Sequence, residues 1–136
     1  MKTTSFSPLR DLIVVKAKVW GPCGHTDLDL ALDTASAHSV ILPEHRDTLG
    51  FNPADGEAIT DVYSAVGKEQ GYMIKVPSFS ALGFTLADFP IHVFELAARY
   101  GIDDLLGLSF LHRYNYTVRS AEGLILVEEI PAELLA

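Results

Sequence analysis

The chain has 136 residues, 49% of them hydrophobic, and its 18 acidic and 10 basic residues give a net charge of −8 with neutral histidines. A chain of this length buries roughly 70% of the surface that it exposes when unfolded, so we expect one folded domain, over residues 1–136, with its own core. The acidic balance excludes nucleic acid as the default partner, because affinity for nucleic acid comes mostly from clustered Lys and Arg.

Cysteine content and hydropathy bear on the cellular compartment. Cys23 is the single cysteine, so no intramolecular disulfide can form, and this indicates a reducing environment. Residues 1–10 lack the apolar segment of a secretion signal, and no stretch approaches the ~18 uninterrupted apolar residues of a membrane helix. We therefore expect a cytoplasmic protein with no membrane partner.

Short apolar runs rich in Val, Ile, Leu and Phe alternate with Gly, Pro, Asn and Asp along most of the chain. This pattern predicts many short strands, with a spacing that suits a barrel or a sandwich. The predicted strands are Leu12–Trp20, Thr26–Leu32, Ser39–Leu42, Ala58–Val66, Gly71–Val76, Phe84–Leu86, Ile91–Phe94, Tyr114–Arg119 and Leu124–Glu128. The fold class is therefore predicted to be all-β or mainly β.

Two segments depart from the strand pattern. Pro43–Leu49 has proline at a first-turn position and Gly50 just beyond its end, and in Asp103–Arg113 the apolar residues fall at helical spacing. Both signals predict short helices.

A hairpin is predicted around residues 63–76. The polar segment Gly67-Lys68-Glu69-Gln70 lies between two runs that can pair, and Gly71 follows it. This arrangement predicts an exposed hairpin tip at residues 67–71.

One acidic residue follows an apolar strand and precedes three small or hydroxyl residues, in the order Leu32-Asp33-Thr34-Ala35-Ser36. These residues predict a tight turn that leaves the Asp33 carboxylate at the end of a buried strand, where it needs donors from Thr34, Ser36 or the backbone. A catalytic carboxylate and an ordinary turn residue both fit this segment taken alone.

A second segment, Leu105-Leu106-Gly107, lies between the predicted strands Ile91–Phe94 and Tyr114–Arg119. With it, the order of motifs from about Leu12 to Val127 resembles the retropepsin-like aspartic proteases. The matching pieces are Leu32-Asp33-Thr34-Ala35-Ser36 for the Asp-Thr-Gly-Ala/Ser turn, Ser39-Val40-Ile41 for the following strand, Gly71-Tyr72-Met73-Ile74-Lys75-Val76-Pro77 for the returning flap strand, and Leu105-Leu106-Gly107 for the two apolar residues and glycine. The sequence departs from the family at Ala35 and Asp104, where Gly is usual.

The resemblance implies a closed acid-protease barrel with a flap hairpin and one or two short helices. It makes Asp33 the catalytic carboxylate, Thr34, Ala35 and Ser36 its supporting turn, and residues 66–71 a flap over the substrate. The flap residues are Val66, Gly67, Lys68, Glu69, Gln70 and Gly71.

The chemistry of this family needs two carboxylates that share a proton, one acting as general base on a water and the other as acid. Because this chain carries one Asp-Thr turn, the resemblance implies a homodimer that joins two copies of Asp33. It implies an extended peptide or protein substrate, and no metal or organic cofactor.

Three alternatives remain. The first keeps the dimeric fold but makes it a peptide-binding or assembly module without catalysis. The second is a metal site at Cys23, His25 and Asp27, which alternate in an extended segment, although a polar hairpin loop explains them as well. The third is a serine hydrolase built from His38 and a hydroxyl of Thr34, Ser36 or Ser39, but the Gly-x-Ser-x-Gly motif is absent.

Overall fold

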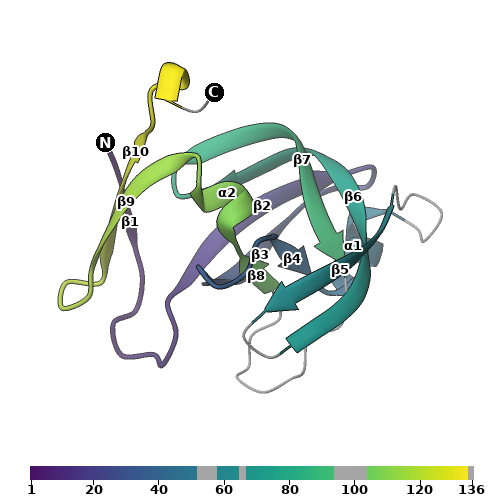
Figure 1. Cartoon of the computed structure of the whole chain (residues 1–136), viewed down its shortest axis with the longest axis horizontal. Helices are drawn as coiled ribbons and strands as arrows, with labels where there is room; N and C mark the ends of the chain where they lie inside the picture. The colour runs from purple at the N-terminus through teal and green to yellow at the C-terminus, as the bar shows by residue number, and fades with distance from the viewer. Residues whose placement is uncertain (52–57, 65–66, 94–103, 135–136) are drawn as a thin grey trace.

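Six strands close on one another into a barrel (Figure 1). The computed structural model describes residues 1–51, 58–64, 67–93 and 104–134. Around the barrel the strands follow the order β2 (Val14–Gly21), β3 (Gly24–Leu32), β8 (Asp104–Leu106), β4 (Val40–Ile41), β7 (Phe84–Val93) and β6 (Gly67–Ala81). A further pairing between β6 and β2 completes the ring, so the mainly β barrel expected from the sequence is confirmed.

The first hairpin of the barrel shows why these residues form strands. In β2, the side chains of Val15, Ala17 and Val19 are buried, and Lys16 between them is exposed. This period of two matches the pleat of a strand that has one face on the core. The apolar alternation therefore determines which face of the hairpin lines the barrel.

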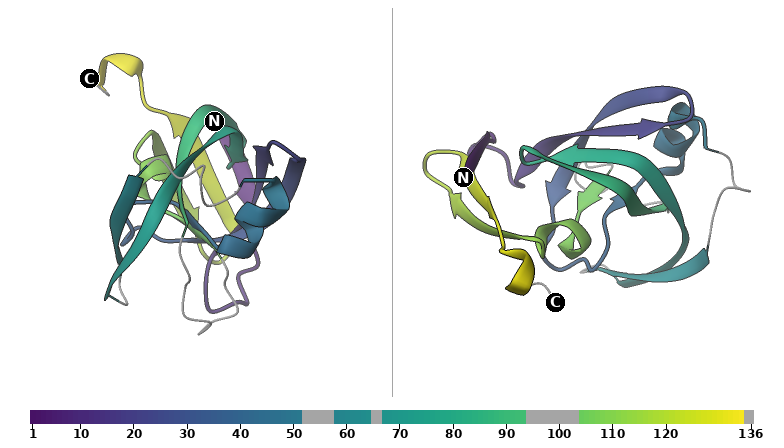
Figure 2. Two further views of the ribbon diagram at one scale, coloured as in Figure 1. Left: turned by 90° about the vertical axis from the view of Figure 1, so that its right-hand side faces the viewer. Right: turned by 90° about the horizontal axis from the view of Figure 1, so that it is seen from above.

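The two ends of the chain form a separate sheet beside the barrel. Its order is β1 (Lys2–Ser5), β10 (Leu124–Glu129) and β9 (Tyr114–Arg119), all antiparallel. Figure 2 shows this sheet to one side of the barrel, and a short 3-10 helix, Ala132–Leu134, follows it. The sequence analysis missed β1, because its four residues carry no apolar alternation.

On the other side of the barrel, β5 (Ala58–Ser64) pairs with the first half of β6 as an antiparallel hairpin. The last pair of this ladder joins Ser64 to Gly67. The predicted hairpin is present, but its predicted tip is wrong, because Gly67–Gly71 belong to β6 and pair with β5. Polar residues between glycines resemble a loop, yet a two-residue connection is enough to join two antiparallel strands.

The helix predicted at Pro43–Leu49 is confirmed as α1. Pro43 occupies its first turn, and Gly50 ends it in a left-handed conformation, with φ of 92°. The amide N–H groups of Gly50 and Phe51 then donate to the carbonyls of Asp47 and Arg46, which satisfies the last turn of the helix.

The helix predicted at Asp103–Arg113 is wrong over its first half. Residues Asp104–Leu106 form β8, which pairs in parallel with β3, and the helix α2 spans Leu108–Leu111. Asp103 itself lies outside the described residues. Helical spacing of apolar residues also arises in a short strand buried on both faces, so spacing alone did not separate the two structures.

Strand β7 replaces two predicted strands, Phe84–Leu86 and Ile91–Phe94, and Phe94 lies outside the described residues. Asp88 interrupts the strand with a positive φ of 49°, and the pairing with β6 skips it. Val76 pairs with Phe89 and Ser78 with Ala87, so the register is unchanged on both sides and the strand continues through Asp88.

The core at the α2 end of the barrel is aromatic. The rings of Phe79 and Phe89 stack with centroids 4.7 Å apart, and Phe110 of α2 meets Phe79 edge-on at 5.5 Å. Tyr114 extends the cluster, with its centroid 5.1 Å from that of Phe110. In the part of the chain that the structure describes, no helix is long and apolar enough to cross a membrane.

Candidate active site

The Asp33 turn begins where β3 leaves the barrel. The Asp33 N–H donates to the carbonyl of Leu106 at 2.9 Å, which continues the parallel pairing of β3 with β8. The Asp33 Oδ1 accepts the Ala35 N–H at 2.9 Å, and the Asp33 carbonyl accepts the Ser36 N–H at 3.3 Å. The donor expected for this carboxylate is therefore a backbone N–H, and the side chain is held in an Asx turn.

Gly107 explains the glycine of the Leu-Leu-Gly motif. A Cβ atom added there would clash with the carbonyl oxygen of His38 and lie 2.7 Å from that of Ser36, so any other residue would force the backbone apart. Where the two segments cross, the Leu108 N–H donates to the carbonyl of Ser36 at 2.8 Å, and the Ser109 N–H donates to the carbonyl of Ala37 at 3.0 Å. The two motifs that are distant in sequence are thus packed backbone to backbone.

A serine network links the same two segments. The Oγ of Ser39, which is buried, accepts the Gly107 N–H at 3.1 Å and lies 3.1 Å from the Oγ of Ser109. The Ser39 N–H also donates to the Ser109 Oγ at 3.1 Å. Ser36 is buried as well, and its hydroxyl donates to the carbonyl of His38 at 2.8 Å. These bonds fix the path of the chain immediately after the Asp33 turn.

The next two residues of the turn face solvent. Thr34 and Ala35 are exposed, and among the described residues no group forms a hydrogen bond with the Thr34 hydroxyl. The described non-glycine residues with positive φ are Leu82 and Asp88, so Ala35 has a negative φ. The methyl group that replaces the hydrogen of glycine therefore causes no left-handed strain at Ala35.

Asp104, the second departure from the family pattern, is fully buried beside α1. Its Oδ1 accepts the Leu42 N–H at 2.9 Å and lies 3.0 Å from the Nδ1 of His45. The carboxylate thus joins β8 to the first turn of α1, and its bonds to the backbone and to His45 offset the cost of burial. The sequence analysis noted Asp104 but gave no signal for His45, which reaches it through the fold.

The rings of His38, in the loop after Asp33, and His92 lie against each other. Their rings stack with centroids 3.9 Å apart and an interplanar angle of 27°. His92 lies on β7 and is 4% exposed. Burial and the neighbouring His38 lower the pKa of His92 to about 4, and burial also lowers the pKa of His38. The sequence analysis missed His92, because nothing local marks a histidine in a strand as part of a site.

The residues expected to form the flap have mixed outcomes. Val66 lies outside the described residues, and Gly67–Gly71 lie on β6 in the hairpin with β5. The role of Val66, Gly67, Lys68, Glu69, Gln70 and Gly71 in substrate binding stays a prediction.

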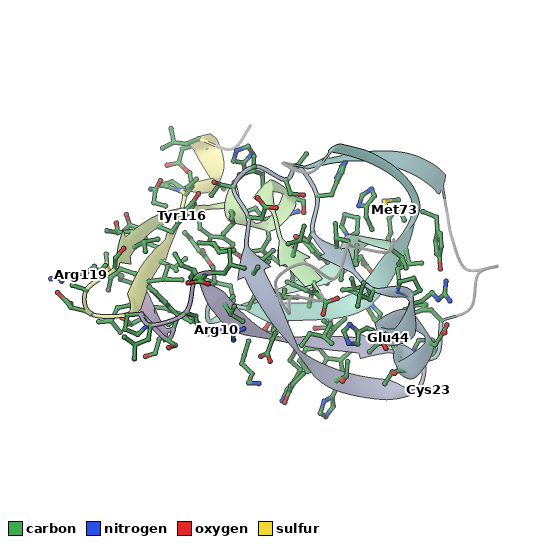
Figure 3. All side chains as sticks on the ribbon, turned by 90° about the horizontal axis from the view of Figure 1, so that it is seen from below. Arg10, Cys23, Glu44, Met73, Tyr116 and Arg119 are labelled. Carbon is green, nitrogen blue, oxygen red and sulfur yellow. The ribbon has the colours of Figure 1, made fainter. Side chains whose placement is uncertain are left out.

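The metal-site alternative is wrong for the described residues, which include Cys23, His25 and Asp27. They contain no group of three or more His, Cys, Asp or Glu side chains that could hold a metal ion. Cys23 lies next to α1, near Glu44 in Figure 3, and the ring of His25 contacts that of Trp20 with centroids 5.8 Å apart.

The serine-hydrolase alternative also lacks its geometry. The hydroxyl of Ser36 donates to the His38 carbonyl, and that of Ser39 is bonded to Gly107 and Ser109. The His38 ring stacks on His92. No serine hydroxyl of the described residues is bonded to the ring that would have to act as its base.

Comparison with known proteins agrees with this geometry. A family model described as Aspartyl protease matches residues 15–110, which include the Asp33 turn and the Leu-Leu-Gly motif. No curated protein matches the sequence.

Two solved structures share the fold. A retropepsin-like aspartic protease from Rickettsia conorii has a TM-score of 0.63 and 18% identity, covering 93% of this chain and 96% of that one. The retroviral protease-like domain of Ddi1 from Leishmania major has a TM-score of 0.54 and 15% identity, covering 88% of this chain and 94% of that one.

Proposed function

Because this chain belongs to the aspartyl protease family, we propose that it is an aspartic endopeptidase, active as a homodimer in which Asp33 of each protomer takes part. The observation that carries the proposal is the Asp33 turn, which is held by the backbone of β8 and by its own Asx bond. A side chain so held has the fixed position that general acid–base catalysis needs.

The reaction uses the two carboxylates of the dimer in different protonation states. One ionised Asp33 takes a proton from a water, and the water oxygen attacks the carbonyl carbon of the peptide bond. The other, protonated Asp33 donates to the carbonyl oxygen. The carboxyl group that took the proton from water then gives it to the peptide nitrogen, the C–N bond breaks, and the carboxylate that donated to the carbonyl oxygen recovers its proton from the new carboxyl group. Two carboxylates this close cannot both ionise at low cost, so they hold one proton between them and titrate as a pair.

The exposed face of the turn supports dimerisation. The Asp33 Oδ1 is occupied by the Ala35 N–H, and Thr34 presents a hydroxyl that has no hydrogen-bond partner among the described residues of its own chain. In a twofold dimer the same turn meets its copy, so the Thr34 hydroxyls can bond across the axis. In this arrangement Thr34 holds the turn through hydrogen bonds across the axis, and Asp33 is the catalytic carboxylate.

We expect the substrate to be an extended peptide segment. The hairpin of β5 and β6 lies at one side of the barrel (Figure 1), and a strand-like peptide can be bound there through main-chain hydrogen bonds. Closure of the hairpin over the peptide would exclude water from the carboxylates.

The test combines the solution mass with cleavage of a peptide library. We expect a dimer by analytical ultracentrifugation, and we expect Asp33→Asn to lower kcat/KM by at least about a thousandfold while the dimer persists. The matched control is Asp29→Asn, at an exposed aspartate of β3, the strand that leads into Asp33, and it should cleave as the wild type does.

Two outcomes would contradict the proposal. An Asp33→Asn protein that still cleaves peptides would exclude the carboxylate mechanism. A wild-type dimer that binds extended peptides and cleaves none of them would favour the binding-module alternative.

A further inference from the structure

The stacked histidines connect the loop that follows Asp33 to β7, the strand that pairs with β6. His38 comes five residues after Asp33 in the same loop, and His92 lies on β7 directly opposite Met73 of β6. Figure 3 shows Met73 on the hairpin side of the barrel, well away from Tyr116 and Arg119 of the terminal sheet. The rings are stacked at 3.9 Å, so they form one unit that joins the two parts of the site.

Backbone contacts tie each ring to the segment that follows Asp33. The His92 N–H donates to the carbonyl of Ser39 at 3.0 Å, and His92 pairs with Val40 of β4. The carbonyl of His38 accepts the Ser36 hydroxyl, and the carbonyl of Ser36 accepts the Leu108 N–H. These bonds fix the backbone at both histidines, so the rings separate either by rotation of the partly exposed His38 side chain or by movement of residues 36–39.

The surroundings of the stack favour two neutral rings. His92 is 4% exposed, and its Nδ1 is buried without a hydrogen-bond partner among the described residues. Burial is the first cause that lowers the pKa of His92, to about 4, and the charge of His38 is the second. Two imidazolium rings at this distance would repel each other in a site with little water.

Among the described residues, His38 is the charged group that shifts the pKa of His92. Asp33 lies at the start of the same loop, and its Oδ1 accepts the Ala35 N–H. Lys75, two residues beyond Met73 on β6, is exposed. Asp104 on β8 is held by Leu42 and His45.

We propose that the His38–His92 stack is a proton-sensitive positioning device that holds the Asp33 turn in its active arrangement while His92 is neutral. Protonation of the buried His92 ring separates the stack and moves residues 36–39, so the Asp33 turn loses its brace. The inference rests on the proposed function, because it predicts that the rate of peptide cleavage falls at low pH. A carboxylate pair usually works best at acidic pH, so the stack would act against that optimum.

Cleavage by the wild type and by His92→Phe tests the device from about pH 3 to pH 8. Phenylalanine keeps an aromatic ring in the stack and removes the titrating group. One pH unit below a pKa of about 4, neutral His92 is roughly tenfold less abundant than its protonated form. We therefore expect the ratio of kcat/KM at about pH 3 to that at pH 7 to be roughly tenfold higher in His92→Phe. The ratio is taken within each protein, so a uniform change in activity does not affect it.

His25→Phe is the matched control, because His25 is an exposed histidine on β3 far along the chain from the stack. It should have the wild-type ratio. Equal ratios in the wild type and His92→Phe would overturn the proposal. If His92→Phe fails to fold, His92→Gln, which also lacks a titrating group, replaces it with the same expectation.

A second readout needs no catalysis and separates this inference from the proposed function. In Asp33→Asn, whose side-chain oxygen still accepts the Ala35 N–H but does not titrate, we follow the histidine ring and the Ala35 amide resonances by NMR. We expect the amide to shift with the titration of His92. If the Ala35 amide resonance does not shift while the histidine rings titrate, the stack is not coupled to the Asp33 turn. This outcome would overturn the inference even if the wild type cleaves peptides.

Discussion

The surroundings of Asp33 and the α2 end of the barrel are packed by different physical means. Among the described residues, the buried polar or charged side chains are Ser36, Ser39, His92 and Asp104, and all of them belong to the segments around the Asp33 turn. At the other end, the aromatic rings of Phe79, Phe89, Phe110 and Tyr114 fill the core.

These two kinds of packing have different roles: one positions Asp33 and the other stabilises the fold. Apolar packing has little directional preference and stabilises in proportion to the area that it buries. Buried hydrogen bonds contribute little net stability, but an unmade one is costly, so they define one arrangement of the chain. We therefore expect the aromatic end to supply most of the stability and the polar end to set the geometry of Asp33.

The largest expected loss of stability comes from the aromatic end. Phe110→Ala removes the ring that meets Phe79, Phe89 and Tyr114, and it should lower the free energy of unfolding by about 3–5 kcal/mol. Urea unfolding at fixed protein concentration measures this change. Leu134→Ala, at a side chain that is 72% exposed, should change it by less than about 0.5 kcal/mol. Similar losses in both variants would contradict the assignment of the core.

The polar end should make stability depend on pH through His92. The unfolded state binds a proton below a pKa of 6.5, whereas the folded state binds it only below about 4. The free energy of unfolding therefore falls as the pH drops from 6.5 to 4, by up to roughly 3 kcal/mol at 1.36 kcal/mol per unit. Thermal or urea unfolding across this range should show that the free energy of unfolding falls less in His92→Phe than in the wild type. An equal fall in both proteins would refute the role of His92.

Ser39→Ala tests most directly whether the serine network positions the segment after Asp33 or only stabilises the fold. It removes the acceptor of the Gly107 N–H, which remains buried, at a cost of about 1–3 kcal/mol. We expect kcat/KM to fall at 25 °C, where the variant is still folded, because the segment after Asp33 loses its link to β8. Ser120→Ala, at an exposed serine, is the control. A variant that loses stability but keeps its full kcat/KM would show that the network supports the fold alone.

The smallest effect is expected on the outer face of the β2–β3 hairpin. The Lys16 Nζ and Asp29 Oδ1 atoms are 3.0 Å apart, and the two side chains are 76% and 60% exposed. Solvent and salt screen such a pair, so Asp29→Asn should change the free energy of unfolding by less than about 1 kcal/mol. A larger loss would mean that this face, too, contributes to the specification of the barrel.

Local sequence was sufficient for features that depend on near neighbours. The alternation in β2 and β3 predicted strands, Pro43 and Gly50 bounded α1, and the resemblance of the Asp33 and Leu-Leu-Gly motifs to one family predicted the barrel. Each of these signals lies within a few residues, where propensity, capping and side-chain period act.

Tertiary structure decided the rest. Leu105 and Leu106 have the same apolar character in a helix as in a strand, and parallel pairing with β3 made them β8. Pairing with β6 in one continuous register let β7 run through Asp88, where the sequence indicated two strands. His92 and His45 joined the site because β7 and α1 pack against the loop after Asp33. Such partners are distant in sequence, so the fold and not the local pattern brings them together.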